Sequence, residues 1–166
     1  MFAKCTSLTQ APELPATTLA NSCYSDMFVR CSSLTQAPVL PATTLADNCY
    51  SNMFYICSSL TQAPQILPAE TLADSCYKSM FANCSSLKQA PELPATTLAN
   101  RCYTSMFANC SELNYIKVGF TNWAGTATFG WLPETSGTFE CPQTLINNTT
   151  TRTTSTVPAS WTMVAV

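Results

Sequence analysis

One pattern recurs through the first two-thirds of the chain: Leu, Cys, Met and Cys, each four residues after the last. In one unit these residues are Leu45, Cys49, Met53 and Cys57, and the series returns at a period of 26 residues. Tandem units of this size predict a solenoid, because each unit buries its apolar face against its neighbours. At 3.6 residues per turn, the spacing of four predicts an apolar stripe on an α-helix of roughly three to four turns.

The units are read from one Met-Phe pair to the next. Complete units are expected at 1–26, 27–52, 53–79 and 80–105, and a fifth begins at Met106 and departs from the pattern after Leu113. The third unit carries one extra residue in Gln65-Ile66-Leu67-Pro68. We expect a bulge there, because a proline-bounded connection tolerates an insertion best.

Each unit divides into a strand, a connection and a helix. Leu14-Pro15-Ala16-Thr17-Thr18-Leu19 is typical of a helix entry, since proline fits the first turn, and the helix is expected to end near Cys31. The segment 34–38 is expected to be a short strand, with Leu34 and Ala37 pointing inward and Pro38 ending the ladder. The predicted fold is therefore an α/β solenoid, a right-handed β-α superhelix of about five 26-residue repeats.

The last third of the chain has a different composition. The repeat gives way at 114–118 to a strand-like segment without proline, followed by aromatic and threonine-rich sequence with glycine turns. We therefore predict two parts, a leucine-rich-repeat-like solenoid over 1–113 and a β-rich C-terminal cap over 114–166. Within the cap, 149–156 is expected to be a loop and 157–166 a final strand. A cap would cover the apolar surface and free strand edge that end a solenoid.

Composition excludes some classes of protein. Charged residues make up 10% of the chain and the net charge is −2, so a nucleic-acid partner has little electrostatic basis. No apolar run is long enough to predict a membrane span. The chain begins in phase with the Met of later units, so we expect a fragment whose export signal and earlier units lie upstream. A short gene starting at Met1 is the alternative, and an uncapped 1–8 segment would permit end-to-end association.

The ten cysteines suggest three kinds of chemistry. Helical geometry places thiols eight residues apart about 12 Å from each other, and thiols on neighbouring helices about 9–10 Å, which is too far for disulfides. The chain has no histidine and no Cys-x-x-Cys, so neither a zinc site nor a Cys–His nucleophile is expected. We predict buried free thiols, no metal, no cofactor and no catalysis, while pairing of Cys110 with Cys141 stays open.

The aromatic residues are expected to pack. The Phe row belongs to the core, and the Tyr row is expected to be half-buried with its hydroxyls at the edge. Trp123, Trp131 and Trp161 suggest either packing within the cap or a sugar-binding platform, and packing is favoured.

The candidate ligand surface is a polar row in the middle of the predicted strands. If Leu and Ala point inward, neighbouring side chains alternate outward onto the ribbon face. They form either a hydrogen-bonded ladder between units or a repeated platform for a protein or glycan. The row consists of Thr9, Gln10, Thr35, Gln36, Thr61, Gln62, Lys88 and Gln89.

The motif Met-Phe-x-x-Cys-x-x-Leu (Met27, Phe28, Cys31 and Leu34 in one unit) resembles the BspA-like leucine-rich repeats of bacterial surface proteins, of the type found in gut Bacteroidetes. Those repeats usually have Ala in place of Met, and they lack the second Cys and the Pro after the strand. The resemblance implies a non-enzymatic adhesion module, at the cell surface or secreted, that binds host protein, other cells or glycan. The alternative is a structural spacer that presents another domain.

Overall fold

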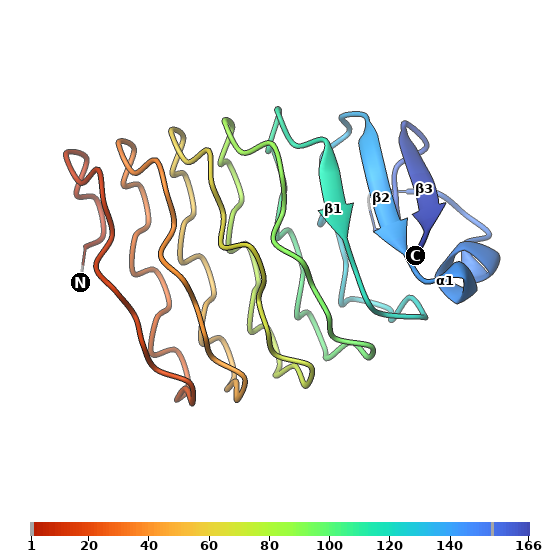
Figure 1. The fold of residues 1–166 in the computed structure, drawn as a ribbon, viewed down its shortest axis with the longest axis horizontal. Helices are drawn as coiled ribbons and strands as arrows, with labels where there is room; N and C mark the ends of the chain where they lie inside the picture. The colour runs from red at the N-terminus through yellow and green to blue at the C-terminus, as the bar shows by residue number, and fades with distance from the viewer. Residues whose placement is uncertain (1, 154) are drawn as a thin grey trace.

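The computed structural model describes residues 2–153 and 155–166. The chain winds into a row of stacked coils, with the N-terminus at one end of the stack and the C-terminus at the other (Figure 1). The predicted repeat fold is therefore confirmed, whereas the right-handed sense of the superhelix stays a prediction. Met1, the expected start of the first unit, and Thr154, within the expected 149–156 loop, lie outside the described residues.

The predicted repeat helices are wrong. The segments 20–31, 46–57, 73–84 and 99–110, here called the turn segments, are chains of overlapping turns. In the first, alternate amides donate three residues back, as Cys23 N–H does to Ala20 C=O at 3.3 Å. The amides between them donate to the next turn segment, as Tyr24 N–H does to Cys49 C=O at 2.9 Å. Five such bonds of 2.8–3.0 Å join each neighbouring pair of these four segments.

The four-residue spacing has its cause in the backbone. Every fourth residue of a turn segment has a positive φ, which lets each four-residue turn repeat without rotating its apolar side chains away from the core. Nine of these twelve residues are Asn, Asp or Ser, which tolerate this conformation or favour turns, and Ile56 (φ 61°) is the β-branched exception. The twelve are Ser22, Asp26, Arg30, Asn48, Asn52, Ile56, Ser75, Ser79, Asn83, Arg101, Ser105 and Asn109.

Two columns of stacked aromatic rings form the core inside the turn segments. Phe2, Phe28, Phe54, Phe81 and Phe107 stack with ring centroids 5.4–5.7 Å apart. A parallel column runs from Tyr24 through Tyr50, Tyr77 and Tyr103 to Trp131, with centroids 5.7–5.9 Å apart. The expected half-burial of the Tyr row holds only for Tyr24, because each later tyrosine lies between rings on both sides and is buried.

Eight of the ten cysteines are buried, which confirms the predicted burial for all but Cys5 and Cys23. All ten are free thiols, Cys110 and Cys141 included. The spacing argument against disulfides was wrong, because hydrogen-bonded coils lie closer together than packed helices. The thiols instead bond to backbone, as Cys57 Sγ donates to Phe28 C=O at 3.1 Å. Burial raises the pKa of Cys57, Cys102 and Cys110 to about 12.

The other side of each coil carries the strand segments 9–11, 35–37, 61–63 and 88–90. Isolated parallel bridges pair Gln10 with Gln36 and Gln36 with Gln62, and Gln89 pairs with Tyr115. Leu34 and Ala37 are buried there as predicted. The strands lengthen toward the C-terminus into a parallel sheet of order β1-β2-β3, and α1 follows β2. These elements are β1 (Tyr115–Lys117), β2 (Gly137–Cys141), α1 (Gln143–Asn148) and β3 (Trp161–Ala165).

The C-terminal region continues the ladders of the repeats. Gln89 pairs with Tyr115 of β1, and Phe107 N–H donates to Trp131 C=O at 2.8 Å. Trp131 and Trp161 are buried and Trp123 packs against Trp131, which confirms packing over a sugar platform for these residues. The predicted strands at 114–118 and 157–166 contain β1 and β3, whereas α1 was not predicted. Among the described residues, no helix is both long and apolar enough to cross a membrane.

Candidate functional site

All eight residues of the predicted polar row are exposed on the strand side of the coils. Within the described part of the chain, the glutamine side chains of the row form no hydrogen bond. The one bond from the row's side chains is donated by Thr61 Oγ1 to Thr35 C=O at 3.2 Å. A side-chain ladder between coils therefore does not account for these amides, which remain open to solvent and to a ligand.

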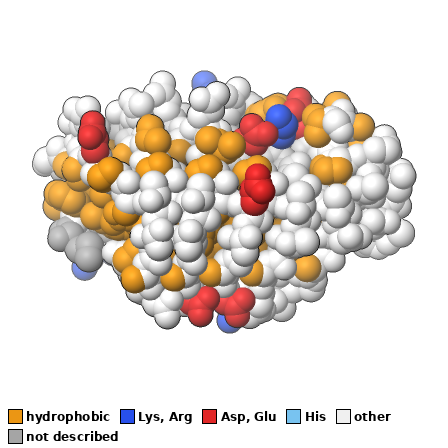
Figure 2. All heavy atoms as spheres, turned by 60° about the horizontal axis from the view of Figure 1, so that its bottom comes forward, with side chains coloured by type: hydrophobic (Ala, Val, Ile, Leu, Met, Phe, Trp, Pro, Cys, Tyr) orange, Lys and Arg blue, Asp and Glu red, His pale blue; other side chains and the backbone are white. Residues whose placement is uncertain are grey.

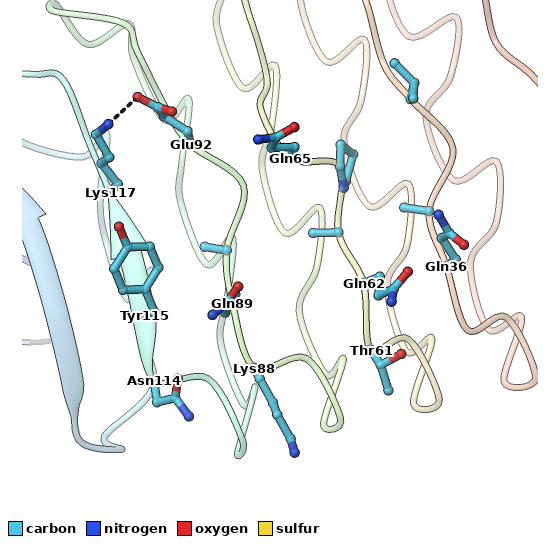
Figure 3. Close-up of a pocket in the computed structure, with 15 residues that line it drawn as sticks. Gln36, Thr61, Gln62, Gln65, Lys88, Gln89, Glu92, Asn114, Tyr115 and Lys117 are labelled. Atoms are coloured by element: carbon cyan, nitrogen blue, oxygen red, sulfur yellow. Dashed lines mark ion pairs between the residues drawn. The ribbon is translucent and has the colours of Figure 1, made fainter.

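A groove of about 860 Å³ lies over the later part of this surface. Figure 3 shows its side chains in three rows that cross the coils. The middle row holds Gln36, Gln62, Gln89 and Tyr115, and Thr61, Lys88 and Asn114 lie on one side of it. Gln65, Glu92 and Lys117 form the row on the other side.

The groove brings together five of the eight predicted residues. Gln36, Thr61, Gln62, Lys88 and Gln89 line it. Thr9, Gln10 and Thr35 do not, although they are exposed as well. The predicted row is thus uniform in sequence, but only its later half borders a concave surface.

The sequence prediction missed the contribution of β1 and of the position after the strand proline. Tyr115 occupies the place of a glutamine and Asn114 the place of Lys88 or Thr61. The sequence did indicate a strand at 114–118. That strand was assigned to the C-terminal cap and was not recognised as the next member of the polar row. Gln65 and Glu92 vary between units, which indicates exposure but does not by itself indicate a groove.

One ion pair and one unpaired cation set the charge of the groove. Lys117 Nζ lies 2.9 Å from Glu92 Oε1, and this contact raises the pKa of Lys117. Lys88 is exposed, and no carboxylate lies within ion-pair distance of it among the described residues. Partial burial, followed by the nearby Glu140 carboxylate, raises the pKa of Tyr115. Among the charged side chains that line the groove, Lys88 is therefore the one cation without a carboxylate within ion-pair distance in the described part of the chain.

The backbone ladder is interrupted beneath the groove. Ala37 N–H donates to Gln62 C=O at 2.9 Å, and Ala90 N–H donates to Tyr115 C=O at 3.0 Å. The equivalent bond from Ala63 to Gln89 is absent within the described residues, and Gln62 does not pair with Gln89. Pairing resumes farther along, where Ile66 pairs with Glu92.

A second hollow, of about 580 Å³, lies on the turn side. Lys4, Arg30 and Lys78 line it together with Asp26. On the face shown in Figure 2, charged side chains are few, and hydrophobic side chains gather toward the N-terminal end. No group of three or more Cys, Asp or Glu side chains able to hold a metal occurs within residues 2–153 and 155–166.

No family profile matches this chain, and no curated protein matches it either. Among solved structures it is similar to a leucine-rich repeat protein from Bacteroides ovatus ATCC 8483, with 17% sequence identity and a TM-score of 0.46. The match covers 84% of this chain and 32% of that protein, so the chain spans about a third of the length of this structural neighbour.

Proposed function

We propose that this chain is a non-enzymatic binding module that recognises its ligand on the strand side. The supporting observation is the coincidence of three features at one place. The groove is a larger hollow than the one on the turn side, its glutamine side chains have no hydrogen-bond partners among the described residues, and it contains five residues of the row predicted from sequence.

We propose further that this binding module serves in adhesion. The resemblance of the repeats to BspA-like surface proteins supports a cell-surface or secreted protein that engages host protein, other cells or glycan. Repetition would add to affinity, because neighbouring copies of a weak site raise the effective concentration of a multivalent ligand.

The competing proposal is a structural spacer, favoured by the uniform turn side. Five backbone bonds across each of three interfaces and continuous stacked rings would make a stiff rod whatever the strand side does. A spacer needs no groove, so the two proposals differ on whether the strand side binds anything.

An array of glycans and extracellular-matrix proteins, probed with the labelled chain, separates them. The binding proposal expects signals that disappear in the double variant Gln62→Ala, Gln89→Ala and survive in the control Gln10→Ala, which lies outside the groove. Signals unaffected by the double variant, or no signals at all, would contradict it and favour the spacer.

A further inference from the structure

We propose that the interrupted ladder between strand segments 61–63 and 88–90 is a subsite for a short carboxylated oligosaccharide. This inference rests on the proposed function and assigns a ligand class to the same groove. The unit at 53–79 is one residue longer than the other complete units. Leu60 and Leu67 are seven positions apart, whereas the equivalent Leu34 and Leu40 are six apart.

The extra residue lies beside the interrupted part of the ladder. An inserted residue in one strand of a pair leaves that strand longer than its partner and disrupts the ladder locally. Deleting Ile66 from the sequence would restore the Pro-x-Leu-Pro spacing that Pro38 to Pro41 shows in the preceding unit. The ladder is interrupted between the neighbouring segments 61–63 and 88–90, and on both outer sides of the gap it is intact.

The gap exposes donors and acceptors side by side. The amides of Ala63 and Lys88 and the carbonyls of Thr61 and Gln89 have no backbone partner among the described residues. A ligand that matches such a mixture must donate and accept at closely spaced points. Sugar hydroxyls do both, as water does, and the amide side chains of Gln62 and Gln89 add further groups of each kind.

The apolar content of the groove argues against a peptide. Peptide and protein ligands are held mainly by large apolar or aromatic anchors in buried pockets. The groove offers one aromatic ring, that of half-buried Tyr115, and its one strongly exposed large apolar side chain is Val39 at 78%. A single ring beside a row of amides suits the apolar face of a sugar flanked by its hydroxyls.

The charge of the groove specifies an acidic sugar. Glu92 neutralises Lys117, so Lys88 is left to pair with an anion. The size follows from the ladder, because Gln36 to Tyr115 crosses three strand spacings, about 14 Å at roughly 4.8 Å each. This length fits a short oligosaccharide lying across the coils along the row in Figure 3.

The test is calorimetric titration of the full chain with trigalacturonate, with neutral galactotriose and with triglutamate. We expect trigalacturonate to bind, and galactotriose to bind about tenfold more weakly for lack of the charged hydrogen bond. Two variants copy residues from neighbouring units and so keep the fold. Lys88→Thr should abolish the preference for the acidic sugar, and Tyr115→Gln should weaken both sugars about fivefold. Deletion of Ile66 should restore the backbone pairing between segments 61–63 and 88–90 and abolish the binding of both sugars.

The control Lys78→Ser places the serine of a neighbouring unit in the basic hollow of the turn side. It should leave trigalacturonate binding unchanged. Loss of binding in Lys78→Ser but not in Lys88→Thr would overturn the assignment, as would equal binding of triglutamate. Groove-dependent binding of array proteins without any sugar binding would overturn the ligand class while leaving the proposed function intact. Absence of all groove-dependent binding would overturn both.

Discussion

The turn side and the strand side differ in regularity although the same repeat encodes them. Between segments 20–31 and 99–110 the turn side keeps five backbone bonds at each interface, and its aromatic rings stack at nearly constant spacing. The strand side is joined by single bridges, is interrupted between 61–63 and 88–90, and carries the groove. Stability and recognition can therefore be varied separately, since an insertion on one side leaves the other side in register.

The largest expected effect is on the turn side and depends on pH. Burial raises the pKa of Cys57, Cys102 and Cys110 to about 12, against about 8.5–9 in an unfolded chain. The contribution of these buried, protonated thiols to the free energy of unfolding is complete below pH 8.5 and is lost as the pH rises toward 12. Together these three thiols should remove about 4 kcal/mol of unfolding free energy per pH unit. Urea unfolding from pH 7 to 10.5 measures this loss.

A single substitution isolates one buried thiol in that experiment. Cys57→Ala should reduce the slope of stability against pH by about one proton. A flat dependence between pH 9 and 10.5 would mean that the turn side is not sealed from water.

The next largest effect compares one residue from each side. Phe54→Ala removes a fully buried ring from the middle of its column and should cost about 3–5 kcal/mol. Gln62→Ala, at an exposed amide that has no side-chain partner in the described part of the chain, should change stability by no more than about 0.5 kcal/mol. Chemical denaturation of the two variants measures the difference, and similar costs would refute the division between the sides.

A smaller effect has the opposite sign. Within the described residues, the hydroxyls of Tyr50 and Tyr77 are buried without a hydrogen-bond partner. Removing an unsatisfied hydroxyl relieves its desolvation cost, so Tyr77→Phe should stabilise the chain by about 1 kcal/mol. Tyr24→Phe, at the half-buried start of the column, is the matched control and should be close to neutral. Destabilisation by Tyr77→Phe would show that its hydroxyl has a partner.

The smallest effect concerns backbone strain. Ile56 has a φ of 61° at a position where the next two units carry Asn83 and Asn109, whose side chains bond to each other at 3.2 Å. Ile56→Asn should relieve this backbone strain and add a third asparagine to the row. We expect it to raise the free energy of unfolding by up to about 1 kcal/mol. Ile56→Val, which is still β-branched, should not raise the free energy of unfolding. Equal free energies of unfolding for the two variants, measured by thermal denaturation, would contradict the claim that the backbone is strained at this position.

The repeat, the inward residues and five of the fifteen residues that line the groove could be predicted from the sequence, because buried positions recur periodically along it. It did not predict the turn segments correctly. On an α-helix, Leu45, Cys49, Met53 and Cys57 would drift about 40° at each step of four, so a strict spacing of four fits a four-residue turn better. The Asn and Ser residues at Asn48, Asn52, Ser75 and Ser79 carried the same information, since they favour turns over helix interiors.

The groove itself could not be predicted for a different reason. The insertion near Ile66 was visible and a bulge was expected, but its effect on pairing depends on how the neighbouring strand segment lies. The contribution of Tyr115 required knowing that β1 continues the repeat ladder past the point where the sequence pattern ends.

Amide hydrogen exchange tests the opened ladder most directly. The amides of Ala63 and Lys88 should exchange rapidly, while those of Ala37, Ala90 and Asn114, which donate at 2.9–3.0 Å in the intact parts of the ladder, should be protected. On the turn side, Phe54 and Tyr77 amides should be protected as well. Protection of Ala63 and Lys88 equal to that of Ala37 and Ala90 would mean that the ladder is closed and the groove has no such subsite.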